Sequence, residues 1–448
     1  MKDFIRRNLQ FIMMLLIWVA CGFVNMYLAY AAVGISILLL KRRNMYAELI
    51  VGFIFILILS DSRQDQLEFA KTIKNIYLVS LTLFALFDRK QFQYKNTFFL
   101  PFVPFLAWAV VTVFKAPQFS VAAQKTLSYG LLFLVTPTYF IKAFHEYGTR
   151  FLKDFTWLIT CLLILGLLLI ILKPDFVFLA GRFTGLLGNP NGLGIFCTLF
   201  FMLFSCIQIK FKDLYTRNEL ILIYAVLMIC VVLTGSRNAL TSIFIFLVFT
   251  RFYKISYWLG FLALIGLGLV YQTVISNLPT LLEAFGLTEA LRADTLESGS
   301  GRLVAWGFAW EVINSSPLQF FMGGGFSFDE FAFFLNRDWL STLGHQGGVH
   351  NTYLALWMNT GIIGLVLWII GFFRTVMKAI PITYTAVPMM YAIVFSATFE
   401  AWLMGSLNPY TIMFLFILSL LTTPTESFVG TNRIIETPND TDPILHTP

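Results

Sequence analysis

Apolar residues form long runs along most of this chain, and short polar segments separate one run from the next. Helical runs of roughly 15 to 23 apolar residues are taken as crossings of a bilayer. The pattern therefore predicts a chain built from membrane-spanning helices. The runs lie at residues 8–22, 24–40, 46–60, 73–87, 97–114, 129–142, 155–172, 192–209, 219–234, 239–250, 256–275, 351–373, 384–404 and 410–422. Because the first, second and tenth runs are short, we predict about twelve to fourteen crossings.

Lysine and arginine gather in alternate loops between these runs, and the N-terminal segment belongs to the same set. The basic clusters are Lys41-Arg42-Arg43, Arg89-Lys90-Lys95, Lys142-Arg150-Lys153, Lys210-Lys212-Arg217, Arg251-Lys254 and Arg374-Lys378. Such an excess of positive charge is typical of cytoplasmic loops. We therefore expect these loops and both termini to face the cytoplasm, and the other loops to lie outside it.

The composition agrees with this picture, because 58% of the residues are hydrophobic and only 12% are charged, as in integral membrane proteins. The net charge of +7 follows from the basic cytoplasmic loops, so it does not indicate a nucleic-acid partner. The five cysteines lie inside apolar runs without paired spacing, which predicts neither disulfides nor a zinc site. No small-residue cleavage site follows the first run, so we interpret it as a retained membrane helix rather than a signal peptide.

The predicted orientation divides the chain into four parts. Membrane helices one to eleven occupy residues 1–275, a large extracytoplasmic loop spans 276–350, the last membrane helices occupy 351–422, and 423–448 form a polar cytoplasmic tail that we expect to be disordered. In the loop, "SGSGRLVAWGFAWEVINSSP" is typical of a helix that Ser298 or Ser300 caps and that ends at Ser316-Pro317. The predicted fold class is an all-α polytopic membrane protein with short helices in one large loop.

Three arginines on the predicted outer side differ from ordinary loop charges. Arg182, Arg237 and Arg302 each stand at a membrane edge beside Gly, Ser or Thr. A single arginine there can simply extend its charge to the lipid headgroups. Three together favour a diphosphate ligand, because each guanidinium can hold two phosphate oxygens in one plane.

His350 and Asn351 stand where the apolar run 351–373 begins. The positive end of a helix dipole disfavours a protonated imidazole, so a histidine at this position is suited to accept a proton. The alternative is a histidine that only caps the helix. Asn351 can orient the histidine or bind a substrate hydroxyl. His345 lies close enough in sequence to share a metal with His350, but no cysteine completes such a set, and we predict no metal site.

Other polar and aromatic residues are candidates for binding substrate. Trp306 and Trp310 follow Arg302 at four-residue spacing, so they share its helix face and can stack on a sugar ring or pack on lipid. Trp339 has the same two possible roles. In "GNPNGLG", Asn191 is a candidate ligand for substrate, and the glycines allow a headgroup to approach the backbone.

These residues resemble the O-antigen ligase and polymerase superfamily. His350-Asn351, nine residues, Gly361, two residues and Gly364 resemble the ligase signature, and "RFTGLLGNPNGLG", "TGSRNAL" and "SGRLVAW" resemble its other blocks in the same order. The resemblance implies a C-type glycosyltransferase fold, His350 as the signature histidine, and Arg182, Arg237 and Arg302 as the functional arginines. Ligases of this family usually have twelve crossings, so a count of fourteen adds one hairpin, in the part before residue 130.

The resemblance also implies a function. Such an enzyme takes a glycan from undecaprenyl diphosphate at the periplasmic face of the bacterial inner membrane, inverts the anomeric configuration, and uses no metal or cofactor. We expect the acceptor to be the lipid A-core, as in a ligase. Two alternatives stay open at this point: a polymerase that joins lipid-linked repeat units, and a flippase for lipid-linked sugars. The clustering of charge at one face and the lack of an internal repeat favour an enzyme over a transporter.

The predicted orientation can be tested by cysteine labelling of intact cells. In a background without the native cysteines, a cysteine at Ser298 should react with a membrane-impermeant reagent and a cysteine at Asn44 should not. Labelling after cell lysis provides the control for reactivity. Equal labelling of both positions in intact cells would contradict the orientation.

Overall fold

The computed structural model describes residues 2–88, 92, 99–255, 259–260, 262, 301–345 and 347–424. Almost all of these residues that belong to a regular element are helical. The membrane-type helices are α1 (Lys2–Val24), α2 (Met26–Arg42), α3 (Tyr46–Ser60), α4 (Phe69–Phe87), α5 (Val103–Val113), α6 (Phe119–Tyr147), α7 (Thr149–Leu172), α9 (Pro190–Lys210), α10 (Arg217–Thr234), α11 (Arg237–Ile255), α18 (Thr352–Ala379), α19 (Ala386–Phe399) and α20 (Pro409–Thr422). A short helix α8 (Pro174–Val177) precedes a small hairpin, in which β1 (Phe178–Leu179) pairs antiparallel with β2 (Arg182–Phe183).

The apolar runs of the sequence correspond closely to these helices, so the prediction of an all-α polytopic membrane protein is confirmed. Seven described helices are long and apolar enough to cross a membrane, and α3, α5, α19 and α20 are shorter apolar helices. The predicted run at 256–275 lies mostly outside the described residues, as do most of the predicted tail and residues 276–300 of the large loop. The described part of that loop contains the short helices α14 (Arg302–Ile313), α15 (Pro317–Met322), α16 (Phe328–Leu335) and α17 (Arg337–Thr342).

Several predicted boundaries differ from the structure, among them that of α6, which begins at Phe119 rather than at residue 129. The run 97–114 forms a helix only from Val103, after a 3-10 turn at Leu100–Phe102, because Pro101 and Pro104 restrict the backbone there. The α-helix in the run 384–404 ends at Phe399, Glu400 is extended, and a 3-10 turn follows at Trp402–Met404. In the large loop Gly301 stands at the N-cap of α14 with a positive φ of 75°, and the predicted caps Ser298 and Ser300 lie outside the described residues.

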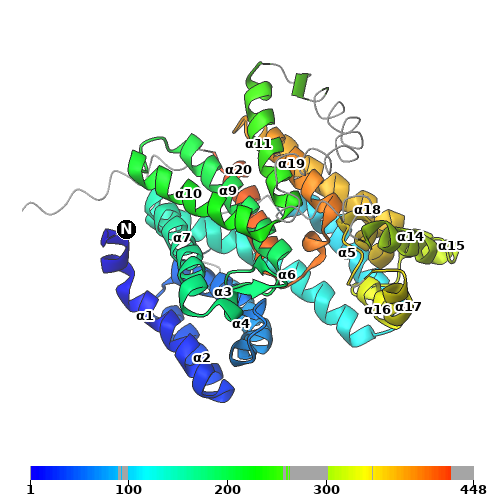
Figure 1. Cartoon of the computed structure of the whole chain (residues 1–448), viewed down its shortest axis with the longest axis horizontal. Helices are drawn as coiled ribbons and strands as arrows, with labels where there is room; N and C mark the ends of the chain where they lie inside the picture. The colour runs from blue at the N-terminus through cyan, green and yellow to red at the C-terminus, as the bar shows by residue number, and fades with distance from the viewer. Residues whose placement is uncertain are drawn as a thin grey trace, which may run out of the picture.

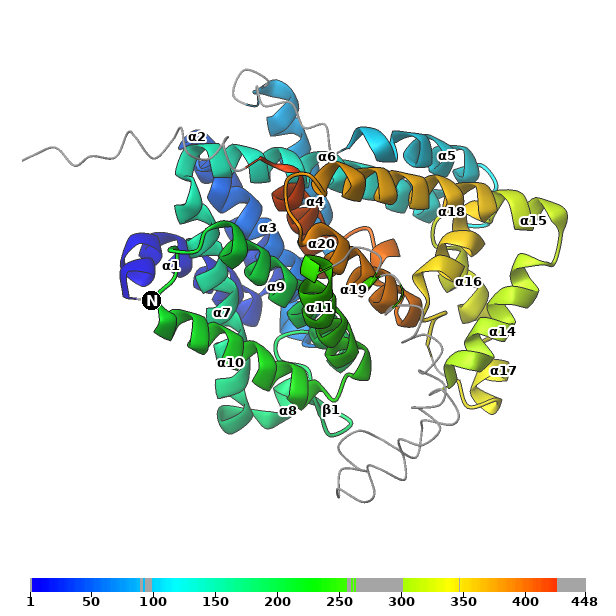
Figure 2. The same ribbon diagram turned by 90° about the horizontal axis from the view of Figure 1, so that it is seen from above.

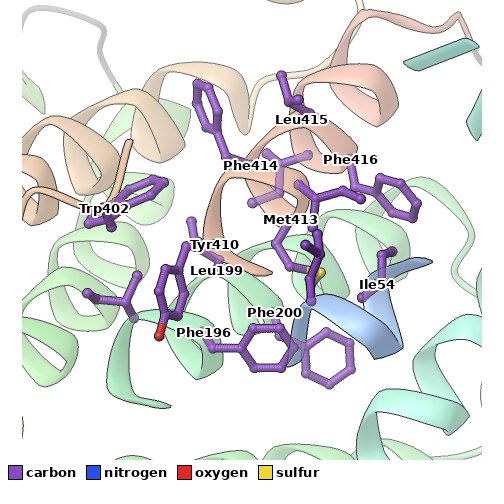
Figure 3. Close-up of a cluster of buried hydrophobic side chains, with 14 of the residues drawn as sticks. Ile54, Phe196, Leu199, Phe200, Trp402, Tyr410, Met413, Phe414, Leu415 and Phe416 are labelled. Atoms are coloured by element: carbon purple, nitrogen blue, oxygen red, sulfur yellow. The ribbon is translucent and has the colours of Figure 1, made fainter. Parts of the chain in front are cut away.

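The core lies between helices that are far apart in sequence. α9 packs on α10, α11 and α20, and α20 also contacts α6. Figure 3 shows Met413 of α20 directed toward Phe196 and Phe200 of α9. In two perpendicular views, α9 and α20 lie inside the bundle, α1 and α2 lie at one edge, and α14 to α17 form a separate group beside α18 (Figures 1 and 2). The loop helices therefore meet the membrane bundle mainly through α18.

A break inside α18 fixes the position of the loop helices. Gly361 leaves the helical conformation, with φ 68° and ψ 178°, and such a break removes the usual partners of the preceding carbonyl groups. The glycine-rich turn after α15 supplies new partners, because the N–H of Gly324 donates to Met358 O at 2.9 Å and the N–H of Gly325 donates to Asn359 O at 2.7 Å. Trp108 Nε1 donates to Thr360 O at 2.8 Å. The break is thus hydrogen-bonded from both α5 and the large loop.

Gly361→Ala should destabilise the protein, because φ is positive there and an added Cβ would overlap the carbonyl group of Phe321. Gly307→Ala is a matched control, since Gly307 lies in the middle of α14 and a Cβ there meets nothing within 4 Å. We expect a loss of about 2 kcal/mol or more for the first and a gain of up to about 1 kcal/mol for the second. Thermal unfolding in detergent measures both. Equal midpoints for the two variants would contradict this account of the break.

Candidate active site

Glu400 is the centre of the polar cluster at one end of the bundle. It follows the last residue of α19, its backbone is extended, and only 8% of the residue is exposed. The hydroxyl of Thr352 donates to the backbone carbonyl of Glu400 at 2.8 Å. This hydrogen bond connects the end of α19 to the start of α18. The carboxylate is therefore held between two membrane helices, where an unpaired charge would be costly.

Three side chains donate to this carboxylate. Arg302 Nη2 lies 2.8 Å from Glu400 Oε1, and Asn191 Nδ2 lies 3.0 Å from the same oxygen. His350 Nδ1 lies 3.1 Å from Glu400 Oε2. One buried carboxylate thus brings together α9, the start of α14 and the segment before α18.

Arg182 joins the cluster through Asn191. Its Nη2 donates to Asn191 Oδ1 at 2.7 Å, and its Nε donates to the carbonyl of Thr234 at 2.8 Å. Arg182 is placed there by the β-hairpin, whose turn contains Ala180 and Gly181 with positive φ. The structure therefore connects Arg182, Asn191 and Arg302, three of the residues that the sequence singled out.

His350 is oriented by the local backbone as well as by Glu400. Asn351 is the N-cap of α18, and its side-chain oxygen accepts from the N–H groups of Tyr353 and Leu354 at 2.9 and 3.0 Å. His350 precedes this cap with a positive φ of 46°, an uncommon conformation for a residue other than glycine. The capping role thus belongs to Asn351, and the ring of His350 is directed to the carboxylate.

The charge of Glu400 decides which nitrogen of His350 carries the proton. Burial alone would raise the pKa of Glu400, but the hydrogen bond and charge of His350, followed by those of Arg302, hold this pKa below its ordinary value. An ionised carboxylate only accepts hydrogen bonds, so His350 Nδ1 must be protonated. In the neutral imidazole the lone pair is then on Nε2, which is the arrangement that a general base needs.

His345 lies close to His350 but has a different hydrogen-bond partner. It is 3% exposed, its Nε2 lies 3.1 Å from Gly348 O, and its ring stands nearly perpendicular to that of His350 at 5.8 Å. Burial, followed by the nearby His350, lowers the pKa of His345. Among the residues that the structure describes, no three His, Cys, Asp or Glu side chains are grouped to hold a metal ion.

The remaining predicted residues lie on α11, α14 and α17. Arg237 is the first residue of α11 and follows closely after Thr234, to which Arg182 is bound. Trp306 packs on Phe399 with ring centroids 6.1 Å apart, next to Glu400. Trp310 packs on Trp357 of α18 at 5.6 Å. Trp339 packs against Phe308 at 5.9 Å and is half exposed.

Trp306 differs from the other two tryptophans in one respect. Its indole nitrogen is buried, and no described residue accepts a hydrogen bond from it. A buried indole N–H usually has an acceptor. Because Trp306 lies one helical turn after Arg302, this donor is close to the polar cluster and is suited to a ligand oxygen.

Residues 221–369 match a family model described as O-antigen ligase. This part of the chain is therefore similar to the O-antigen ligase family. The match includes Arg237, Arg302, His350 and Asn351, while Glu400 and the Arg182–Asn191 pair lie outside it. No curated protein matches the chain. This similarity supports a role in lipid-linked glycan transfer.

Glu400 is the residue of this site that the sequence pattern did not single out. It lies inside "SATFEAWLMG", within the run predicted to cross the membrane at 384–404. A signal was present, because ionisable residues within apolar spans are rare and are usually functional. The sequence did not indicate its partners, since Arg302 and His350 are 98 and 50 residues away.

The pKa of Glu400 leads to a prediction of pH-dependent stability for the protein. A folded-state pKa below the ordinary value stabilises the protein at neutral pH, and this contribution is lost as the pH falls through the folded-state pKa. Glu400→Gln should therefore be less stable than the wild type at pH 7, by about 3 kcal/mol, and the difference should narrow in acid. Thermal unfolding in detergent at a series of pH values measures it.

Glu330→Gln is the matched control. Glu330 pairs with Lys125 at 2.6 Å, but its side chain is 68% exposed, so we expect a change below about 1 kcal/mol. A Glu400→Gln protein as stable as the wild type at pH 7 would show that the carboxylate does not hold the cluster together.

Proposed function

We propose that the chain transfers a glycan from undecaprenyl diphosphate to a sugar hydroxyl, with inversion, at the periplasmic face of the inner membrane. The observation that carries the proposal is the His350–Glu400 contact, flanked by Arg302 on the same carboxylate. It joins a base, its orienting group and a cation that suits a diphosphate. The family supports lipid-linked glycan transfer in general, and the donor, the acceptor and the stereochemistry belong to the proposal.

The reaction follows from the positions of these groups. His350 Nε2 takes the proton from the acceptor hydroxyl, and the oxygen attacks the anomeric carbon of the donor. The bond between this carbon and the diphosphate breaks on the opposite side, so the configuration inverts. Glu400 keeps the imidazole in the required tautomer and stabilises the imidazolium that forms, as carboxylates do beside other catalytic histidines.

The arginines stabilise the diphosphate as it leaves. A guanidinium has five N–H donors, and among the described contacts of Arg302 only one of them is used, by Glu400. Arg302 thus has donors left for phosphate oxygens. Arg182, tied to the same cluster through Asn191, and Arg237 add positive charge where negative charge develops in the transition state. With the leaving group stabilised in this way, the proposed reaction needs no metal ion.

Trp306 and Trp310 are proposed to contact sugar. Trp306 has the stronger support, because its buried indole N–H has no acceptor among the described residues and its ring lies beside Phe399, the neighbour of Glu400. Asn191 holds Arg182 and Glu400 together, so its role in binding substrate is through the orientation of both. Asn351 is proposed to orient His350 through the helix cap.

Variants of His350 separate a base from a structural residue. If His350 removes the acceptor proton, His350→Ala should lower turnover by about two to four orders of magnitude with little change in donor binding. His350→Asn can donate a hydrogen bond to Glu400 but cannot act as a base at neutral pH, so it should be as inactive as alanine. The assay uses purified protein, lipid-linked donor and acceptor. Efficient transfer by the asparagine variant would exclude His350 as the base.

His345→Asn is the control for substitution of a nearby histidine, because His345 contacts Gly348 rather than Glu400. It should keep far more activity than His350→Asn in the same assay. A parallel reaction with a chelator tests the metal-free mechanism. Loss of wild-type transfer in chelator, restored by a divalent ion, would overturn this part of the proposal.

The acceptor can be identified from a deletion strain. We expect a ligase, so deletion should leave long glycan chains on undecaprenyl diphosphate and a lipid A-core without them. Extraction and electrophoresis of the lipid-linked and lipid A-linked glycans measure both pools. Single repeat units on the lipid A-core would contradict a ligase and indicate a polymerase instead.

A further inference from the structure

A cavity lies between α1, α3 and α7, far from the polar cluster around Glu400. The space between its atoms is about 520 Å³, which includes the open solvent at its mouth. The cavity is lined by Phe4, Asn8, Phe11, Ala47, Glu48, Val51, Tyr147, Arg150, Phe151, Asp154, Phe155 and Leu158. α3 runs from this cavity to Asp61, whose carbonyl approaches Gly188 next to Asn189. At 1.5 Å per residue, a helix of 15 residues is about 22 Å long. The cavity is therefore at the opposite end of the bundle from the cluster.

The cavity exists because α1 packs only loosely on the rest of the bundle. α1 makes most of its contacts with α2 and only a few with α3, and it lies at the periphery in both views (Figures 1 and 2). An ion pair of 2.7 Å between Arg7 and Asp154 connects its first turns to α7. Next to this ion pair, the apolar side chains of α1 and α7 leave the cavity unfilled.

The walls of the cavity are apolar, and its charged groups are incompletely paired. Asp154 binds Arg7 at 2.7 Å and Arg150 only at 3.7 Å, so Arg150 is weakly held. Glu48 Oε2 is buried, and no described residue donates a hydrogen bond to it. A buried carboxylate oxygen without a donor is rare in folded proteins. The cavity thus contains an unpaired acceptor on Glu48, the weakly paired guanidinium of Arg150 and an apolar wall.

We propose that this cavity binds a phospholipid with a primary ammonium group, of the phosphatidylethanolamine class, from the leaflet at that end of the bundle. The ammonium donates to Glu48, the phosphate accepts from Arg150, and the upper part of an acyl chain lies against Phe11, Phe151 and Phe155. An anionic phospholipid lacks the cation that Glu48 requires. A choline lipid has the charge but no N–H donor for the carboxylate oxygen. This lipid site is separate from the proposed glycosyl transfer and does not depend on it.

Competition between lipids tests the site on the full-length protein. The purified and delipidated protein is incubated in detergent with equal amounts of phosphatidylethanolamine, phosphatidylglycerol and phosphatidylcholine of identical acyl chains, and retained lipid is counted by native mass spectrometry. We expect the ethanolamine lipid to be retained about tenfold over the others, since a hydrogen bond between charged groups contributes on this scale. Equal retention of the three lipids would overturn the proposal.

Two glutamine variants assign the preference to the cavity. Glu48→Gln should abolish the roughly tenfold preference while the protein elutes as the wild type does in size-exclusion chromatography. Glu146→Gln is the matched control at the same end of the bundle, because Glu146 pairs with Lys142 and does not line the cavity. It should keep the wild-type preference. Retention of the preference by Glu48→Gln, or its loss in Glu146→Gln, would place the lipid elsewhere.

Discussion

The buried carboxylate of Glu400 is the interaction on which the arrangement of the site depends. A charge in this position is unfavourable unless donors surround it, and here Arg302, His350 and Asn191 supply them within 3.1 Å. Each donor comes from a different part of the chain. The same ion that costs free energy to bury therefore fixes the relative positions of the loop, the bundle and the histidine.

The large loop reaches this position through a second constraint, the break in α18 at Gly361. The glycine-rich turn after α15 binds the carbonyl groups that the break leaves open, so α14 to α17 are attached to the membrane helix that begins beside His350. Arg302 starts α14 and is carried to Glu400 by this attachment. Two glycines of the sequence signature thus have a structural role. Gly361 allows the break in α18, and a Cβ at Gly364 would overlap the side chain of Thr360 beside that break.

The sequence predicts the helices well because each one is a local apolar run long enough to cross a bilayer. It also predicts Arg182, Arg302 and His350 as neighbours, because the alternation of loops puts them on one side. The prediction fails where tertiary contacts decide. The pattern predicted a crossing at 384–404 that includes Glu400, whereas α19 ends at Phe399. The N-cap of α14 is Gly301, which the pattern of serines before the helix did not indicate. Neither the break in α18 nor the cavity beside Glu48 is visible in a pattern of apolar residues.

A double-mutant cycle between Arg302 and Glu400 tests the central claim, that these residues form one unit around His350. The rates of glycan transfer are compared for the wild type, Arg302→Lys, Glu400→Gln and the double variant, with each protein first shown to be folded. Residues that act as a unit lose most of their effect in the first substitution, so the double variant should be no more than a few-fold slower than the slower single variant. Multiplicative losses in the double variant would show that Arg302 and Glu400 act independently and would contradict this account.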